Sequence, residues 1–272
     1  GISKDFQSNY VAGSSDWLVV EADEYDRSFL HLNPKLGSIL SADADHLDIY
    51  GDAEEILTGG FMAYANLVED QLYVNSAFWK DFSGVDKAVS YGIDSGSWRA
   101  ERVRVEEGRF CFDFVGPGVL WEDLIMALPG RHNIENAVLA LSICHRFNLD
   151  EKALRNALES FKGIARRFER IYEDETHVYI DDYAHHPTEL DAAILAAREL
   201  YPERRITGIF QPHLFSRTKD FIDGFARSLE KLDQLFLLDI YPAREAPIPG
   251  VDSALLFEKI KLENKVLCTK DS

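Results

Sequence analysis

The sequence predicts an α/β fold arranged as two successive units in which strands alternate with helices. Short apolar runs at residues 17–20 and 37–40 are typical of strands buried on both faces, and an amphipathic helical pattern follows at 53–68. After Gly163 the same alternation of strand and helix patterns starts again. Alternation of this kind implies parallel sheets with right-handed crossovers. We therefore expect two parallel-sheet domains with a boundary near residue 164.

The later elements of the first unit also follow from local pattern. Residues 98–114 alternate between apolar and polar side chains, and the Glu-Glu-Gly-Arg segment at 106–109 suits a hairpin turn. Two helices are expected at 134–147 and 151–161, and Gly163 ends the second.

The second unit is expected to contain strands, helices and a proline-rich loop in regular succession. The strands are expected at 177–180, 206–210, 235–238 and around Val266; the helices from Thr188, at 220–232 and around Leu255; and the loop at 241–250.

The composition limits the classes of protein that fit. The chain has 272 residues, of which 46% are hydrophobic and 28% charged, as in a globular protein with one large or two medium domains. Its net charge of −18 argues against non-specific nucleic-acid binding and against attraction to an anionic membrane, although a few focused arginines could still bind an anion. No apolar run approaches the roughly 20 residues of a membrane-spanning helix. Cys111, Cys144 and Cys268 lack CxxC spacing, so we expect buried thiols and a reducing, cytoplasmic location.

The most informative segment is the run from Asp181 to Glu189. It follows a predicted strand and precedes a predicted helix whose first turn suits Pro187. The run contains Asp182, Tyr183, His185 and His186, which would lie at the carboxyl end of a strand and beside a helix N-terminus. Ligands of open α/β sheets bind at such places, and helix N-termini attract anions. We therefore predict a ligand site here, in which either histidine could be a general base or a binding group.

Two acidic segments follow the first two predicted strands. Residues 21–26 begin with Glu21, and residues 43–48 contain His46. Because the carboxyl ends of adjacent parallel strands meet at one edge, we expect these side chains to lie together. Oxygen ligands of this kind suit Mg²⁺, which usually retains water and contacts substrate phosphates.

Three further clusters are candidate binding sites. Asn133 and Asn136 share one face of a helix start and could bind an adenine edge, or Asn133 could be only a helix N-cap. Arg166 and Arg167 could bind a phosphate together or form an exposed salt-bridged pair. The third cluster follows a strand and adds polar residues to the same rim as Tyr183: His213, Ser216 and Arg217. Together the clusters predict a nucleotide and Mg²⁺ on one domain that face a carboxylate- or amine-binding rim on the other.

At these residues the chain resembles the bacterial Mur ligases, and within them the alanine-adding branch. The resemblance covers nearly all of the chain and rests on six motifs: Val-Glu-Ala-Asp-Glu at 20–24, Asp-His-Leu-Asp at 45–48, Gly-Arg-His-Asn at 130–133, Arg-Arg-Phe-Glu at 166–169, the run at 181–189, and Phe-Gln-Pro-His at 210–213.

The resemblance implies an ATP-dependent ligase of peptidoglycan precursor synthesis. In the family, the carboxylate of UDP-N-acetylmuramate takes the γ-phosphoryl group of ATP, and the amine of L-alanine then attacks the acyl phosphate. The residues implied are Glu21 and His46 for Mg²⁺; Asn133 and Asn136 for adenine; Arg167 and Asp182 for the nucleotide; Tyr183, His185, His213, Ser216 and Arg217 for the substrates; and His185, His186 and Arg217 for catalysis. No oligomeric state is implied.

Two departures from the family pattern shape the expectation. The phosphate-binding sequence Gly-x-x-x-x-Gly-Lys-[Ser/Thr] occurs nowhere, whereas the family carries it, and a UDP-binding domain, upstream of the segment that resembles Gly1 onward. We therefore expect a piece of a longer enzyme, inactive alone: a P-loop-type central ATPase domain over 1–164 that lacks its P-loop, and a truncated Rossmann-like C-terminal domain over 165–272. Leu214 also stands where many relatives have Arg, which removes one expected substrate contact.

Two alternatives remain open at this stage. The ligase that recycles murein tripeptide shares the His-His-Pro segment, although Phe-Gln-Pro-His at 210–213 favours the alanine-adding enzyme. A non-catalytic nucleotide- or sugar-binding module would also fit a chain without a P-loop.

Overall fold

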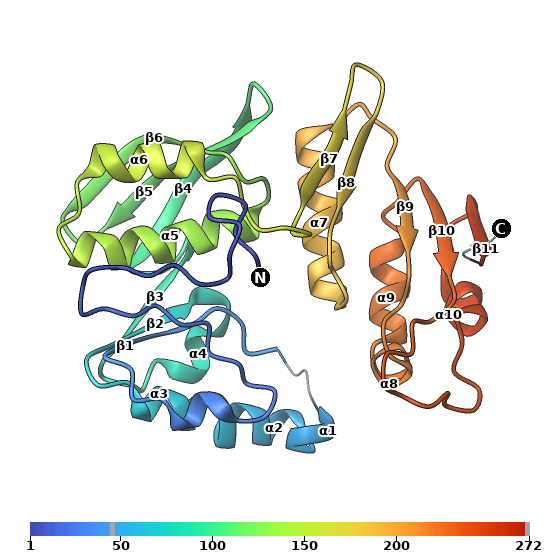
Figure 1. The fold of residues 1–272 in the computed structure, drawn as a ribbon, viewed down its shortest axis with the longest axis horizontal. Coiled ribbons are helices and arrows are strands. Elements are labelled where there is room, and N and C mark those ends of the chain that lie inside the picture. Colours follow the sequence, from blue (N-terminus) through green and yellow to red (C-terminus); the bar gives the residue numbers. More distant parts are fainter. Residues whose placement is uncertain (44–46, 270–272) are drawn as a thin grey trace.

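The computed structural model describes residues 1–43 and 47–269 and divides them into two lobes (Figure 1). The first lobe contains β1–β6 and α1–α6, and the second contains β7–β11 and α7–α10. The amino-terminal segment returns to the joint between the lobes, where Ala165 N donates to Ile2 O and Lys4 N donates to Gly163 O. Within the described residues, no helix is both long enough and apolar enough to cross a membrane.

The first lobe is built on one six-stranded sheet in the order β1-β2-β3-β4-β5-β6. Its strands are β1 (Leu36–Ile39), β2 (Gln71–Asn75), β3 (Ala88–Ile93), β4 (Trp98–Glu106), β5 (Arg109–Gly116) and β6 (Val119–Met126). The first four are parallel, which agrees with the predicted parallel sheet, although β2 and β3 themselves were not predicted. Strands β4, β5 and β6 form an antiparallel meander. The predicted hairpin turn connects β4 to β5 through Glu107 and Gly108, both at positive φ as a tight hairpin requires.

The helices of the first lobe agree with the predicted pattern. Residues 53–67 form one continuous helix with a π-helical middle, and the two later helices begin and end close to the expected residues. The full set is η1 (Ser28–His31), α1 (Leu47–Tyr50), α2 (Ala53–Glu55), η2 (Ile56–Met62), α3 (Ala63–Leu67), η3 (Ser76–Phe78), α4 (Trp79–Phe82), α5 (Arg131–Arg146) and α6 (Glu151–Ser160).

The strand predicted at residues 17–20 is wrong. This segment is irregular and exposed, with Val19 at 97% accessibility. A buried strand needs a neighbouring ladder on each side, and the only partner of β1 among the described residues is β2. Although the apolar pattern of residues 17–20 is strand-like, the segment does not pair with the open edge of β1 and therefore stays exposed.

A bulge crosses the three antiparallel strands and is organised by one buried carboxylate. The register shifts between Glu101 and Arg104 and again around Asp113, and Arg102 and Asp123 have positive φ. Asp113 is buried, accepts from Asp123 N at 2.9 Å, and pairs with Arg102 Nε. The carboxylate thus satisfies groups that the disrupted ladder leaves unpaired.

The second lobe contains two sheets and four helices. A two-stranded antiparallel sheet joins β7 (Glu169–Glu173) to β8 (Val178–Asp181), and a parallel sheet has the order β11-β10-β9. The remaining elements are α7 (Pro187–Leu200), β9 (Thr207–Phe210), α8 (Phe215–Asp220), α9 (Ile222–Leu229), β10 (Gln234–Leu238), α10 (Ser253–Lys259) and β11 (Lys265–Cys268). The strand predicted at 177–180 is confirmed, but it pairs with β7, which the sequence did not predict, rather than with the parallel sheet.

Helix α7 packs against both lobes. Its residues Leu190 and Ile194 belong to the core of the second lobe with Phe225, whereas Ala196 and Leu200 belong to the core of the first lobe. The contact is close: a Cβ on Gly130, just before α5, would lie 3.2 Å from the Cβ of Ala196. The two lobes therefore share an apolar contact next to the predicted site.

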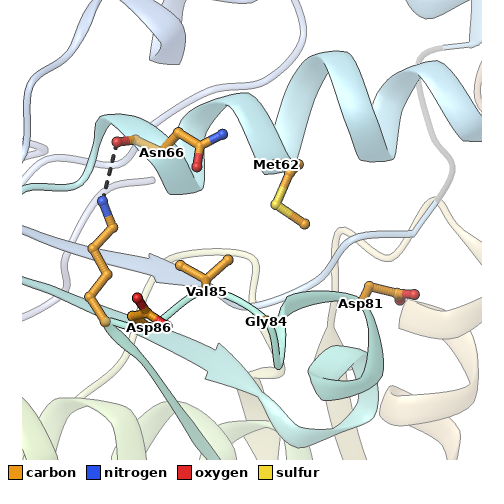
Figure 2. A pocket seen from close by; sticks show the side chains of 7 residues that line it. Met62, Asn66, Asp81, Gly84, Val85 and Asp86 are labelled. Atoms are coloured by element: carbon orange, nitrogen blue, oxygen red, sulfur yellow. Dashed lines mark hydrogen bonds between the residues drawn. The ribbon is translucent and has the colours of Figure 1, made fainter.

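A surface hollow of about 570 Å³ lies at the amino-terminal side of β3 (Figure 2). Lys87 lies beside it and donates from Nζ to Asn66 O at 3.2 Å and to Val68 O, so it binds carbonyls at the end of α3. The hollow lies at the edge of the sheet opposite to the strand ends that carry the predicted motifs. Lys87 stabilises the end of α3 by binding its carbonyl groups.

Candidate active site

The polar rim of the second lobe is formed by three segments that follow strands. These segments lie after β8 (residues 182–186), after β9 (residues 211–216) and after β10 (residues 239–250). His185 and His213 come from two of them, and their ring centroids are 6.4 Å apart. The structure therefore brings the run at 181–189 and the cluster around His213 together, as predicted.

Glu189, in the first turn of α7, is the centre of this rim. Its Oε2 accepts from His185 N at 2.8 Å and from His186 N at 3.2 Å, while its Oε1 lies 3.2 Å from Arg167 Nη1. Burial alone would raise its pKa, but the hydrogen bond from His185 N and the charges of His185 and Arg167 hold it below the ordinary value. Glu189 was not predicted as a site residue, although a Glu three residues after a helix N-cap is a capping-box pattern.

The two histidines of the run have different environments. His185 Nδ1 lies 2.9 Å from the carbonyl of Tyr183 and 3.3 Å from Glu189 Oε2, so Nδ1 carries the proton and Nε2 is the acceptor atom. His186 is the N-cap of α7: its Nδ1 accepts from Thr188 N at 3.4 Å. Its ring packs against Phe221, with 4.6 Å between centroids. His185 thus keeps Nε2 as an acceptor atom, whereas Nδ1 of His186 is used to cap α7.

Asp182 ties the end of β8 to the joint between the lobes. Its carboxylate accepts from Phe168 N and from Ala184 N, both at 2.7 Å. Phe168 has φ of 45°, a left-handed conformation that this hydrogen bond supports. Burial raises the pKa of Asp182, against the effect of these two hydrogen bonds and of Arg167.

The two arginines of the joint lie beside Tyr183. The guanidinium carbon of Arg166 lies 4.5 Å from the centre of the Tyr183 ring, and that of Arg167 lies 6.0 Å away. Tyr183 N also donates to Arg166 O at 2.9 Å. Both arginines are half-exposed or more, so they could contact an anion at the joint without losing buried partners.

A second group of contacts surrounds His213, Ser216 and Arg217. His213 stacks on Tyr241, with 5.6 Å between ring centroids. Burial lowers the pKa of His213, and the charges of Arg217 and His185 lower it further, so the ring is neutral at pH 7. Ser216 N donates to Glu245 Oε2 at 3.0 Å, and Ser216 Oγ also bonds to this carboxylate. Glu245 was not predicted from the sequence.

The first lobe contributes His132 to the joint. This half-buried ring faces Asp182, Arg167 and Glu189, and its Nδ1 has no hydrogen-bond partner among the described residues. Burial is the main cause that lowers its pKa. The preceding residue, Arg131, donates from Nε to Glu199 of α7 at 2.8 Å. His132 is part of the Gly-Arg-His-Asn motif, but no role was predicted for it, because its neighbours in the structure come from a distant part of the sequence.

Asn133 and Asn136 lie in the first turns of α5, as predicted. Asn133 Nδ2 donates to Pro129 O at 2.7 Å, and Asn136 is exposed. The N-cap of α5 is Gly130 at φ of 100°, so the alternative that Asn133 is the N-cap is wrong. No contact joins either asparagine to the second-lobe rim among the described residues.

A buried polar group lies beneath this helix turn and was not predicted. Asn75, the last residue of β2, donates from Nδ2 to Glu135 Oε2 at 3.2 Å and pairs in register with Tyr91 of β3. Burial raises the pKa of Glu135. The group holds the start of α5 against the carboxyl end of the parallel strands.

Of the two predicted magnesium residues, the structure describes only Glu21. Glu21 has a side chain that is 90% exposed and does not follow a strand, because residues 17–20 form none. His46 lies outside the described residues. Over residues 1–43 and 47–269, no three carboxylate, imidazole or thiol groups lie close enough to hold a metal ion.

The two lobes, with polar strand-end loops beside their joint, define a two-domain α/β protein. The chain belongs to the Mur ligase family: residues 6–144 match the Mur ligase middle domain, and residues 166–272 match the glutamate ligase domain of Mur ligases.

Individual relatives agree with this assignment. The UDP-N-acetylmuramate–L-alanine ligase of Christiangramia forsetii is 47% identical over 272 residues, which cover 99% of this chain and 59% of that protein. The solved UDP-N-acetylmuramate–alanine ligase of Thermotoga maritima has a TM-score of 0.73 at 24% identity, covering 92% of this chain and 54% of that one. The MurF ligase of the same organism, solved in complex with ADP, has a TM-score of 0.65 at 17% identity, covering 88% and 53%. This chain spans about 60% of the length of the curated relatives that it matches.

Proposed function

We propose that this chain supplies the middle and C-terminal domains of an ATP-dependent ligase that joins L-alanine to the carboxylate of UDP-N-acetylmuramate in peptidoglycan precursor synthesis. The observation that carries the proposal is 47% identity to an alanine-adding ligase across 99% of the chain. The domain boundary is proposed at residue 164, in the gap between the two family matches.

The nucleotide is proposed to bind at the joint. Asn136, exposed on the first turns of α5, and Asn133 would contact adenine, while Arg167 and Asp182 would approach from the second lobe. The MurF ligase with the same fold was solved with ADP, which supports a nucleotide site in this architecture. Mg²⁺ is expected with ATP from family membership alone, with Glu21 and His46 as its predicted residues, and no step below depends on it.

The second-lobe rim is proposed to bind the amino acid. In the proposed reaction, the carboxylate of UDP-N-acetylmuramate accepts the γ-phosphoryl group and ADP leaves. The nitrogen of L-alanine then attacks the acyl carbon, inorganic phosphate leaves, and the amine loses a proton. His185 Nε2 is suited to accept that proton, because Nδ1–H is held by the Tyr183 carbonyl and Glu189 stabilises the cation that forms. Arg217 and Tyr183 would hold the substrate carboxylate and acyl phosphate.

Phosphate release by the full-length gene product tests the proposal. With ATP and UDP-N-acetylmuramate present, we expect release to depend on added L-alanine. His185→Asn should lower kcat by about 10²-fold, as loss of a general base does, whereas His177→Asn, at an exposed hairpin position, should leave it unchanged. Release without any amino-acid dependence, or a preference for a preformed murein tripeptide over L-alanine, would show that the proposed substrate is wrong.

A further inference from the structure

The loops after β9 and β10 are joined along their length. Tyr241 N donates to Pro212 O at 2.8 Å, and Leu214 N donates to Tyr241 O at 2.9 Å. The same two loops are joined by the stacked rings of His213 and Tyr241. The rim around His213 therefore depends on the position of the proline-rich loop that follows β10.

Helix α8 begins in an unusual way between these loops. Its N-cap is Leu214, which has φ of 71° and no side-chain oxygen to accept a backbone N–H. The first-turn N–H groups of a helix have no partner within the helix and need one elsewhere. Glu245, from the other loop, meets this need: its carboxylate accepts from Ser216 N and Oγ and from the backbone of Phe215.

Glu245 is itself held in place and is close to the charged groups of the rim. Its backbone N donates to Pro242 O at 2.9 Å. Arg217 stabilises the Glu245 carboxylate by its charge, and Glu245 in turn acts on His213. The carboxylate thus contacts the residue next to Arg217 on α8 and balances part of the positive charge beside His213.

We propose that Glu245 is a positioning residue for the amino-acid side of the site, which fixes Ser216, Arg217 and His213 by capping α8 from the loop after β10. This inference rests on the proposed function, in which that rim binds the incoming amino acid.

Steady-state phosphate release by the full-length gene product separates positioning from a structural role. We expect Glu245→Gln to raise the KM for the amino acid by about tenfold, since small displacements of binding groups weaken a substrate site steeply, with the KM for ATP unchanged. Glu258→Gln, an exposed glutamate on α10, is the matched control and should change neither constant. An unchanged KM for the amino acid, or equal rises in both KM values, would overturn the proposal.

Hydrogen exchange on the chain itself provides a second measurement that does not need activity. In Glu245→Ala, the amide of Ser216 should exchange at least about tenfold faster, because it loses its acceptor, while amides of α9 keep their protection and report an intact fold. Equal exchange at Ser216 in the wild type and the variant would also overturn the proposal. If the wild-type enzyme uses another amine in place of L-alanine, the proposed function is wrong, and the Glu245→Gln comparison is then made with that amine.

Discussion

A buried tyrosine beneath the start of α5 gives a stability prediction with a definite sign. Tyr91 is fully buried, and its hydroxyl has no hydrogen-bond partner among the described residues. Burial, and then the charge of Glu135, raise its pKa, so the side chain is neutral at working pH. We expect Tyr91→Phe to stabilise the first lobe, because the variant removes an unsatisfied hydroxyl and keeps the ring.

The magnitude follows from two opposing effects. An unsatisfied buried hydroxyl costs roughly 1–3 kcal/mol of the free energy of unfolding. Removing one oxygen forfeits a few dispersion contacts, worth about 0.5 kcal/mol in total. The net gain should therefore be about 0.5–2.5 kcal/mol, and each kcal/mol raises the melting temperature of a domain of this size by about 2–4 °C.

Tryptophan fluorescence in urea measures this effect in the correct lobe, since all four tryptophans, at positions 17, 79, 98 and 121, lie before residue 164. Tyr64→Phe is the matched control: Tyr64 is also buried, but its hydroxyl accepts from Ser38 N, so that variant should lose about 1 kcal/mol. If Tyr91→Phe instead loses 1 kcal/mol or more, the Tyr91 hydroxyl is hydrogen-bonded in the folded protein and the reasoning is refuted.

Three further variants test carboxylates of the site and the sheet. Burial raises the pKa of Glu135 above its ordinary 4.5, so the contribution of this carboxyl group to stability is present below pH 4.5 and is lost as pH rises through the raised value. In urea titrations above pH 4.5, Glu135→Gln should therefore lose less stability with rising pH than the wild type, and an identical pH dependence would contradict the prediction. The pKa of Asp113 is lowered, chiefly by its hydrogen bond from Arg102, so the contribution of Asp113 to stability is present above pH 3.8 and is lost as pH falls through the lowered value. Asp113→Asn should therefore lower the melting temperature at pH 7 but not in strong acid. Equal melting temperatures of variant and wild type at pH 7 would refute this role of Asp113. The side chain of Asp182→Asn has only one oxygen to accept with, so Phe168 N or Ala184 N is left unpaired at a cost of about 1–2 kcal/mol of the free energy of unfolding. We expect faster amide hydrogen exchange at one of these two positions, and unchanged exchange at both would contradict the prediction.

Most of the regular elements could be predicted because their signals are local. The hairpin at 106–109, α5 and α6 are determined by periodicity, turn residues and caps within each segment. The segment at 17–20 shows the limit of this reasoning. An apolar run indicates that a strand would be buried if it paired with neighbouring strands. Whether such a neighbour is present depends on the assembled sheet and not on the local sequence. Strand β6, which extends the predicted hairpin by pairing antiparallel with β5, was not predicted.

The clusters of site residues could be predicted from their positions after strands, but the groups that hold them could not. Glu189 and Glu245 are the carboxylates on which the rim depends, and they act in different ways. Glu189 caps its own helix within a few residues, so a capping-box pattern could have revealed it. Glu245 caps a helix whose first turn lies 29 residues earlier, and nothing in the local sequence connects the two.

The position of Glu245 also bears on Leu214, which stands where many relatives have an arginine. A non-glycine residue at φ of 71° costs of order 1–3 kcal/mol and persists only where surrounding contacts impose it. Here the contacts are the bond from Leu214 N to Tyr241 O and the bonds from Thr218 N and Oγ1 to Leu214 O. These are backbone atoms of Leu214, so a leucine keeps the corner as well as an arginine would, and only the contact of the side chain with substrate is lost. Under the proposed function, Arg217 is then the group expected to bind the amino-acid carboxylate, and the carboxylate of Glu245 would fix its place on α8.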